Sequence, residues 1–112
     1  MPKARLFLRI DFERGESIGP GKIRLLESLS THGSLSAAAR ELKMSYRRAW
    51  VLVNSLNATL GTPVAAMATG GRGGGGARLT RAGDALVRRY RALEAAARKA
   101  GATHLKAIAS RR

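Results

Sequence analysis

Residues 34–61 constrain the fold more than any other part of the chain, because their pattern predicts two short helices joined by a tight turn. The segment reads SLSAAARELKMSYRRAWVLVNSLNATLG. Ser36 is the expected N-cap of the first helix, since its hydroxyl can accept a hydrogen bond from a backbone N–H without an intrahelical partner. Ser45 is expected to cap the second helix, Tyr46–Leu60, which ends where Gly61 can adopt the left-handed conformation. Only Lys43 and Met44 separate the first helix, which ends near Leu42, from the cap at Ser45. A turn this short makes the two helices cross steeply, as in a helix-turn-helix.

The second helix of this motif has one apolar and one polar face. Ala49, Val53 and Leu56 recur at helical spacing and predict a buried stripe. The opposite face and its flanks offer basic, aromatic and amide side chains to solvent, which suits insertion into the major groove of DNA. An ordinary helical hairpin with a basic, solvated face is the alternative. The residues expected to contact DNA here are Ser45, Tyr46, Arg47, Arg48, Trp50 and Asn54.

The charge of the chain indicates a polyanionic partner. Its 112 residues allow one domain with a modest core. They include 21 Lys and Arg against 7 Asp and Glu, a net charge of +14, so we expect double-stranded DNA as the partner. A membrane is not expected, because no apolar run approaches the roughly 20 residues of a spanning helix and the N-terminus lacks a secretory signal. The expected location is cytoplasmic.

Two elements are expected before the motif. Between Leu6 and Phe12 every second residue is apolar and inward-facing, which is the period of a half-buried strand. A helix is expected from Lys22 to His32, with Gly33 as its stop, and its apolar stripe would pack across the back of the motif. The helix-turn-helix core therefore spans residues 22–61. The charged residues interpreted as a solvated face of this helix are Lys22, Arg24 and Glu27.

Residues 62–79 change from a helical to an extended pattern and predict a two-stranded wing. Thr62–Thr69 and ARLT are the expected strands, with GGRGGGG between them. A loop this rich in glycine buries nothing and stays at the surface. Arg72 at its tip and Arg78 at its base are expected to reach phosphates or the minor groove, with Ser36 in support. A hairpin tip without a partner is the alternative; a P-loop is excluded because no Lys-Ser or Lys-Thr follows the glycines.

A long helix is expected from Thr80, its N-cap, to about Ala100. Its apolar residues recur with a spacing near seven and form a narrow seam, which can pack on its own domain or on a second copy. We expect a second copy, and thus a homodimer, because so small a domain has little core left to cover this helix. Arg91 and Arg98 belong to its exposed basic face, and the basic tail, 101–112, is expected to fray. The candidate dimer interface consists of Leu79, Leu86, Tyr90, Leu93 and Ala97.

An enzyme or a metal site is not expected. Without cysteine the chain can form neither a disulfide framework nor a Cys-based zinc site. His32 and His104 lie far apart without carboxylates at ligand spacing, so no metal and no cofactor are expected. Only Asp11 and Glu13 are close among the carboxylates, and Ser45 has no histidine partner that would make it a nucleophile.

The chain resembles the DNA-binding domain of the ModE-type molybdate-dependent transcriptional regulators in three motifs: SLSAAARELKMSYRRAW, the glycine-rich wing ending in ARLT, and a helix that begins TRAG. That domain is a winged helix-turn-helix related to the one in LysR-type regulators, and the resemblance covers roughly residues 18–100. Full-length members carry C-terminal oxyanion-binding domains, and this chain ends before such a domain, so no molybdate binding is expected of it. The residues that the resemblance places on DNA are Ser45, Tyr46, Arg47 and Trp50 of the recognition helix and Arg72 of the wing.

Two hypotheses for the function follow. In both, residues 1–112 form a single winged helix-turn-helix domain, mainly α with a small β component and a long C-terminal helix, 80–100. In the first, the protein is a regulator that binds an inverted-repeat operator as a homodimer. In the second, it is an architectural protein that coats DNA through its charge, with little preference for sequence.

Overall fold

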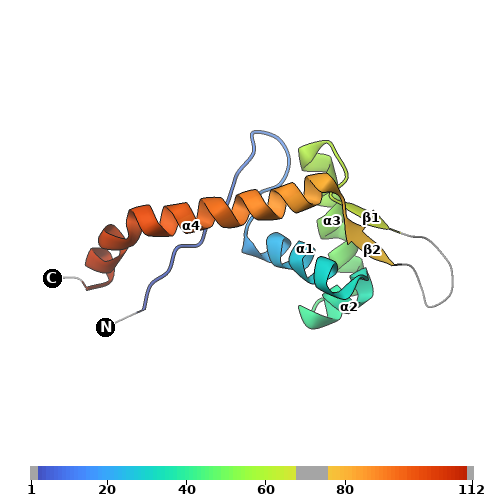
Figure 1. Cartoon of the computed structure of the whole chain (residues 1–112), viewed down its shortest axis with the longest axis horizontal. Coiled ribbons are helices and arrows are strands. Elements are labelled where there is room, and N and C mark those ends of the chain that lie inside the picture. Colours follow the sequence, from blue (N-terminus) through green and yellow to red (C-terminus); the bar gives the residue numbers. More distant parts are fainter. Residues whose placement is uncertain (1–2, 68–75, 111–112) are drawn as a thin grey trace.

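The computed structural model describes residues 3–67 and 76–110, and Figure 1 shows their arrangement. Three short helices and a small hairpin gather at one end of the molecule, and a long helix runs past them and extends beyond. The molecule measures 60 × 29 × 20 Å along its principal axes. Its elements in chain order are α1 (Pro20–His32), α2 (Leu35–Glu41), α3 (Tyr46–Leu60), β1 (Ala65–Met67), β2 (Ala77–Leu79) and α4 (Arg81–Ser110).

The helix-turn-helix forms where the sequence predicts it, with one correction at the first cap. Ser34, not Ser36, is the N-cap of α2, and its Oγ accepts from the backbone N–H of Ala37 at 3.0 Å. Both serines have suitable chemistry, but α1 ends at Gly33, whose φ of 72° turns the chain so that Ser34 follows in an extended conformation. An earlier start also carries Leu35 into the core, while Ser36 lies exposed on the helix.

The limits of α3 are confirmed at both ends. Ser45 accepts from the backbone N–H of Arg48 at 3.0 Å through its Oγ, and Gly61 closes the helix at φ 70° with its N–H on the carbonyl of Asn57 at 2.8 Å. The turn before it passes through Lys43, which has a φ of 58°. The helix that presents the candidate DNA-binding side chains therefore has well-defined caps.

The three helices share one core, as their apolar stripes predict. Ile23, Leu26 and Leu29 of α1 belong to the same buried cluster as Ala38 and Ala39 of α2. The hairpin pairs antiparallel, with Ala65 opposite Leu79, and closes one side. The buried apolar residues are Ile18, Ile23, Leu25, Leu26, Leu29, Leu35, Ala38, Ala39, Ala49, Val53, Leu56, Val64, Ala65 and Tyr90.

The N-terminal strand predicted for Leu6–Phe12 is wrong. The alternation of half-buried and exposed residues is present, but the segment pairs only through an isolated antiparallel bridge between Ile10 and Ile18, with N–H···O distances of 2.8 and 2.9 Å. Residues 3–9 run beside α4 instead (Figure 1). A helix satisfies its own backbone groups and offers no edge, so a neighbouring extended segment cannot build a ladder on it.

The long helix α4 differs from the prediction in two ways. It continues through Gly101 to Ser110 instead of ending near Ala100, so the expected fraying tail is helical. In addition, Tyr90 does not belong to a free seam: it is 1% exposed, and its hydroxyl donates to the carbonyl of Leu8 at 2.7 Å. Leu86 also packs, half-buried, against the domain's own core. The N-terminal segment contacts α4 at Tyr90, which sequence periodicity alone does not reveal.

A network of four charged side chains joins α1 to α4. Arg91 donates to both carboxylate oxygens of Glu27, at 2.7 and 2.9 Å, and to Glu94 at 2.8 Å. Glu94 is buried and also accepts from Arg98 at 3.2 Å. Arg91 and Glu27, interpreted from the sequence as parts of solvated faces, are therefore half-exposed partners in an ion pair. Arg91 and Glu27 lie 64 positions apart in sequence, so only the packing of the two helices brings them together.

Glu27→Gln is expected to destabilise the fold in a pH-dependent manner. The hydrogen bonds from Arg91 hold the pKa of Glu27 below its ordinary value. The ion pair therefore stabilises the protein above the unfolded-state pKa of about 4.3, and this contribution is lost as the pH falls through the lower folded-state pKa. Because the pair is partly exposed, we expect a loss of about 1 kcal/mol at pH 7 that is smaller at pH 3.

Urea unfolding at the two pH values measures this effect. Glu13→Gln is the matched control, since Glu13 is exposed and the described residues form no ion pair with it. A stability difference between Glu27→Gln and the parent protein that stays constant from pH 7 to pH 3 would contradict the ion-pair account.

Candidate nucleic-acid interface

The outer face of α3 carries exposed aromatic, aliphatic and basic side chains. Tyr46 and Trp50, one turn apart, are 55% and 49% exposed, and Val51 beside them is 48% exposed. Arg47 and Asn54 are exposed on the same helix, while Ala49, Val53 and Leu56 face the core. The two faces follow from the helical spacing of these residues. The remaining candidate residues, Ser45 and Arg48, are exposed at the start of the helix.

Two polar groups of this region are held by the helix itself. Ser45 uses its Oγ as the cap acceptor for Arg48. Asn54 donates through Nδ2 to the carbonyl of Trp50 at 2.9 Å, which fixes the amide against the preceding turn. Arg47 is consequently the long polar side chain at the centre of the face, between the aromatic residues and Val51.

The segment of the sequence that forms α3 and the hairpin contains basic residues and no acidic residue. No Asp or Glu occurs between Glu41 and Asp84, whereas this stretch contains Lys43, Arg47 and Arg78. The carboxylates of Glu27 and Glu94 lie elsewhere and already bind arginines. Nothing in the stretch that forms α3 and the hairpin therefore repels a polyanion, and its cations attract one over a range set by the ionic strength.

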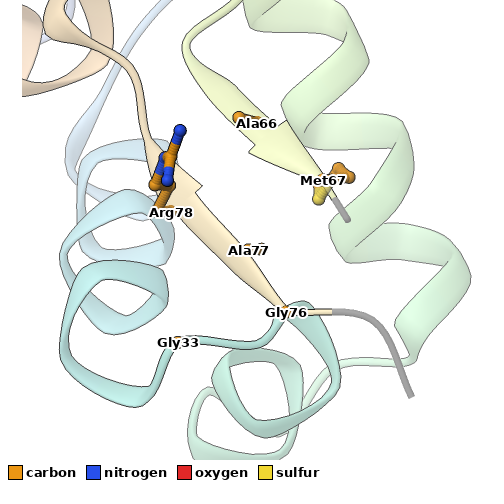
Figure 2. A pocket seen from close by; sticks show the side chains of 6 residues that line it. All are labelled: Gly33, Ala66, Met67, Gly76, Ala77 and Arg78. Carbon is orange, nitrogen blue, oxygen red and sulfur yellow. The ribbon is translucent and has the colours of Figure 1, made fainter. Parts of the chain in front are cut away.

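The hairpin is anchored to the end of α1 next to this surface. The N–H of Ala77 donates to the carbonyl of Gly33 at 2.8 Å, and a hollow of about 430 Å³ lies at this junction. Figure 2 shows Arg78 on β2 and Met67 on β1 at opposite sides of the hollow. Apart from Arg78, its side chains are small or apolar, so Arg78 is the cationic group at the base of the wing. Arg72, predicted at the tip, lies outside the described residues.

Lys22 has a structural role that the sequence did not reveal. Its Nζ donates to the carbonyl of Ser17 at 2.7 Å and to Oγ of Ser55 on α3 at 3.3 Å, and its side chain is largely buried. The interpretation of Lys22 as part of a solvated face is wrong. It ties the loop before α1 to the back of α3, and Glu16 strengthens this tie, since its N–H donates to Oγ1 of Thr59 at 3.1 Å.

His32 also has a partner. Its Nε2 lies 3.2 Å from Oε1 of Glu41, and Ser28 donates to the same carboxylate. The hydrogen bond from Ser28 and the pairing with His32 lower the pKa of Glu41. These contacts join the ends of α1 and α2. Within residues 3–67 and 76–110, no group of three or more His, Cys, Asp or Glu residues gathers in a way that could hold a metal ion, and no helix is long and apolar enough to cross a membrane.

Three helices of which the last two form a helix-turn-helix, followed by a two-stranded hairpin and a long helix, define a winged helix-turn-helix domain. The profile of the bacterial regulatory helix-turn-helix proteins of the LysR family matches residues 21–84. The chain belongs to this family. The crystal structure of the CbnR_DBD–DNA complex superposes with a TM-score of 0.58 at 25% identity, covering 78% of this chain and 95% of that chain.

Curated relatives confirm the resemblance to ModE-type proteins. The chain is 46% identical over 83 residues to the molybdenum-pterin-binding protein MopA of Rhodobacter capsulatus, covering 74% of this chain and 31% of the relative. It is 37% identical over 87 residues to the molybdenum transport protein ModE of Azotobacter vinelandii, covering 78% of this chain and 32% of the relative. It is 35% identical over 88 residues to the DNA-binding transcriptional dual regulator ModE of Escherichia coli, covering 79% of this chain and 34% of the relative. The chain thus spans about a third of the length of these relatives.

Proposed function

We propose that this chain binds DNA as part of a cytoplasmic transcriptional regulator, and that it recognises an inverted repeat as a homodimer. The observation that carries the proposal is the exposed face of α3 with Tyr46, Arg47, Trp50 and Asn54, which lies in an acid-free stretch of the chain. Ser45 and Gly61 cap the helix at its two ends, and the major groove of DNA admits an α-helix. Arg78, and Arg72 beyond the described residues, would hold phosphates or the minor groove from the wing.

The proposed dimer uses the part of α4 that its own domain leaves uncovered. Leu93 is 47% exposed and Ile108 is 67% exposed, and Ala97 lies between them at helical spacing. Because α4 continues beyond Gly101, the seam is longer than the sequence predicts and includes Ile108. Two copies related by a two-fold axis would place their α3 helices about one DNA turn, roughly 34 Å, or a multiple of it apart.

The second candidate function is architectural, and the net charge of +14 is the observation that favours it. The two functions differ in the ratio of affinities for a selected site and for random duplex, measured at one salt concentration. A specific regulator is expected to show a ratio of roughly 10³ or more. A ratio near one would leave the architectural function, since phosphate contacts alone do not distinguish sequences.

Arg47→Ala and Arg78→Ala are expected to lower DNA affinity in different ways. Arg47 lies on the outer face of α3, so its loss should cost roughly 1–3 kcal/mol on the selected site and relax the preference for one base pair. Arg78 lies at the base of the wing, so its loss should weaken binding to all sequences by similar factors. Arg72→Ala at the wing tip is expected to act like Arg78→Ala. Fluorescence anisotropy with the selected site and its single-position variants measures both effects, and equal losses on all sequences from Arg47→Ala would contradict the proposed role of Arg47.

A further inference from the structure

The face of α3 is more apolar than a surface that reads bases by hydrogen bonds alone. Tyr46 and Trp50 lie at i and i+4, where side chains of a helix are neighbours, and Val51 adds a third exposed apolar group. All three are among the most exposed large apolar side chains of the described residues. Leaving these side chains exposed in solution has a free-energy cost, and the core of this domain does not cover them.

The polar groups on the same face are few. Asn54 has one donor bound to the carbonyl of Trp50, which restricts the bidentate approach of its amide to a base edge. Arg47 remains as the long donor side chain of the face. The basic residues around the face, and the lack of acidic residues between Glu41 and Asp84, favour a polyanionic ligand. Within such a ligand, the aromatic pair would contact an apolar group.

Thymine provides that apolar group. In the major groove each base pair displays hydrogen-bond donors and acceptors, and only thymine adds a methyl group, at its C5 position. We propose that Trp50, flanked by Tyr46, packs against the 5-methyl group of a thymine in each half-site. This inference rests on the proposed function, since it requires that α3 enters the major groove. It assigns sequence selection to apolar contact in addition to hydrogen bonding by Arg47.

Replacing thymine by deoxyuridine tests the inference, because this change removes the methyl group and keeps the hydrogen-bonding edge. The site is first selected from random duplexes, and each thymine is then replaced singly. We expect at least one replacement per half-site to lower affinity about fourfold, the factor that corresponds to ~0.8 kcal/mol for one buried methyl group. In Trp50→Ala the same replacement should change affinity by less than a factor of about 1.5, since the partner of the methyl group is gone.

Arg48→Ala is the matched control, because Arg48 lies on α3 outside the aromatic pair. This variant should lose affinity by the same factor for the thymine duplex and the deoxyuridine duplex, so that the fourfold difference between them remains. Circular dichroism shows whether Trp50→Ala keeps its helices. If no replacement affects the parent protein, or if Trp50→Ala keeps the fourfold difference, the inference is overturned, and the aromatic pair would serve another partner. If selection yields no preferred site at all, the proposed function fails first and the inference fails with it.

Discussion

Gly83→Ala is expected to destabilise the protein by about 3 kcal/mol, at the upper end of what overpacking costs. A Cβ atom at this position would lie 2.0 Å from the carbonyl oxygen of Val64 and 2.9 Å from its carbonyl carbon. The obstacle is backbone and cannot rotate away. It is also held in place, because the same carbonyl accepts from the N–H of Thr80 at 3.0 Å, and the hydroxyl of Thr80 donates to Pro63 at 2.7 Å.

The close approach at Gly83 sets the position of α4 on the rest of the domain. Thr80 caps α4, as predicted, through a hydrogen bond from the N–H of Gly83 to its Oγ1 at 3.1 Å. Moving the helix by the ångström or more that an alanine needs would break this cap and separate the helix from the hairpin. The change should therefore appear in urea unfolding as a lower midpoint with a similar slope.

Gly101→Ala is the matched control in the same helix. The nearest heavy atom to an added Cβ there is the side-chain Cδ1 of Leu6 at 3.9 Å, which is an ordinary contact. Because alanine favours a helix interior over glycine, this variant is expected to gain up to about 1 kcal/mol. Equal stability of Gly83→Ala and the parent protein would contradict the packing of α4 against Val64.

Replacing Leu93 and Ile108 together by glutamate is expected to convert a dimer into a folded monomer and to lower affinity for the inverted repeat by roughly 100-fold or more. Both side chains are exposed in the single chain, so the substitution places charge in the proposed seam without removing core contacts. Sedimentation equilibrium measures the oligomeric state, and binding to a single half-site should remain unchanged. A double variant that stays dimeric would show that the dimer forms elsewhere.

The choice of these two residues depends on the structure. Leu86 packs half-buried against the domain's own core, so Leu86→Glu is expected to unfold the protein and cannot report on the dimer. Ala92→Glu with Thr103→Glu is the matched control, because it adds the same charge to α4 at two exposed positions outside the seam. We expect this control to keep the dimer and its DNA affinity.

Local chemistry accounts for the parts of the site that the sequence predicts. The limits of α3 follow from Ser45 and Gly61, whose capping roles depend on their immediate neighbours. The exposed and buried faces of α3 follow from a spacing that the helix imposes on any sequence. Their function as DNA contacts remains a proposal, but the exposure of Tyr46 and Trp50 is what that spacing predicts.

By itself, the sequence determined the caps and faces of α3, the antiparallel hairpin after it and the basic charge of the chain, because each depends on residues within a few positions of one another or on composition. Only the tertiary structure decided that Tyr90 belongs to the core, that the segment at Leu8 follows α4 without forming a strand, and that Arg91 binds Glu27. These contacts join residues 64 to 82 positions apart. Periodicity shows that a side chain faces inward, but which distant element covers it depends on how the helices pack.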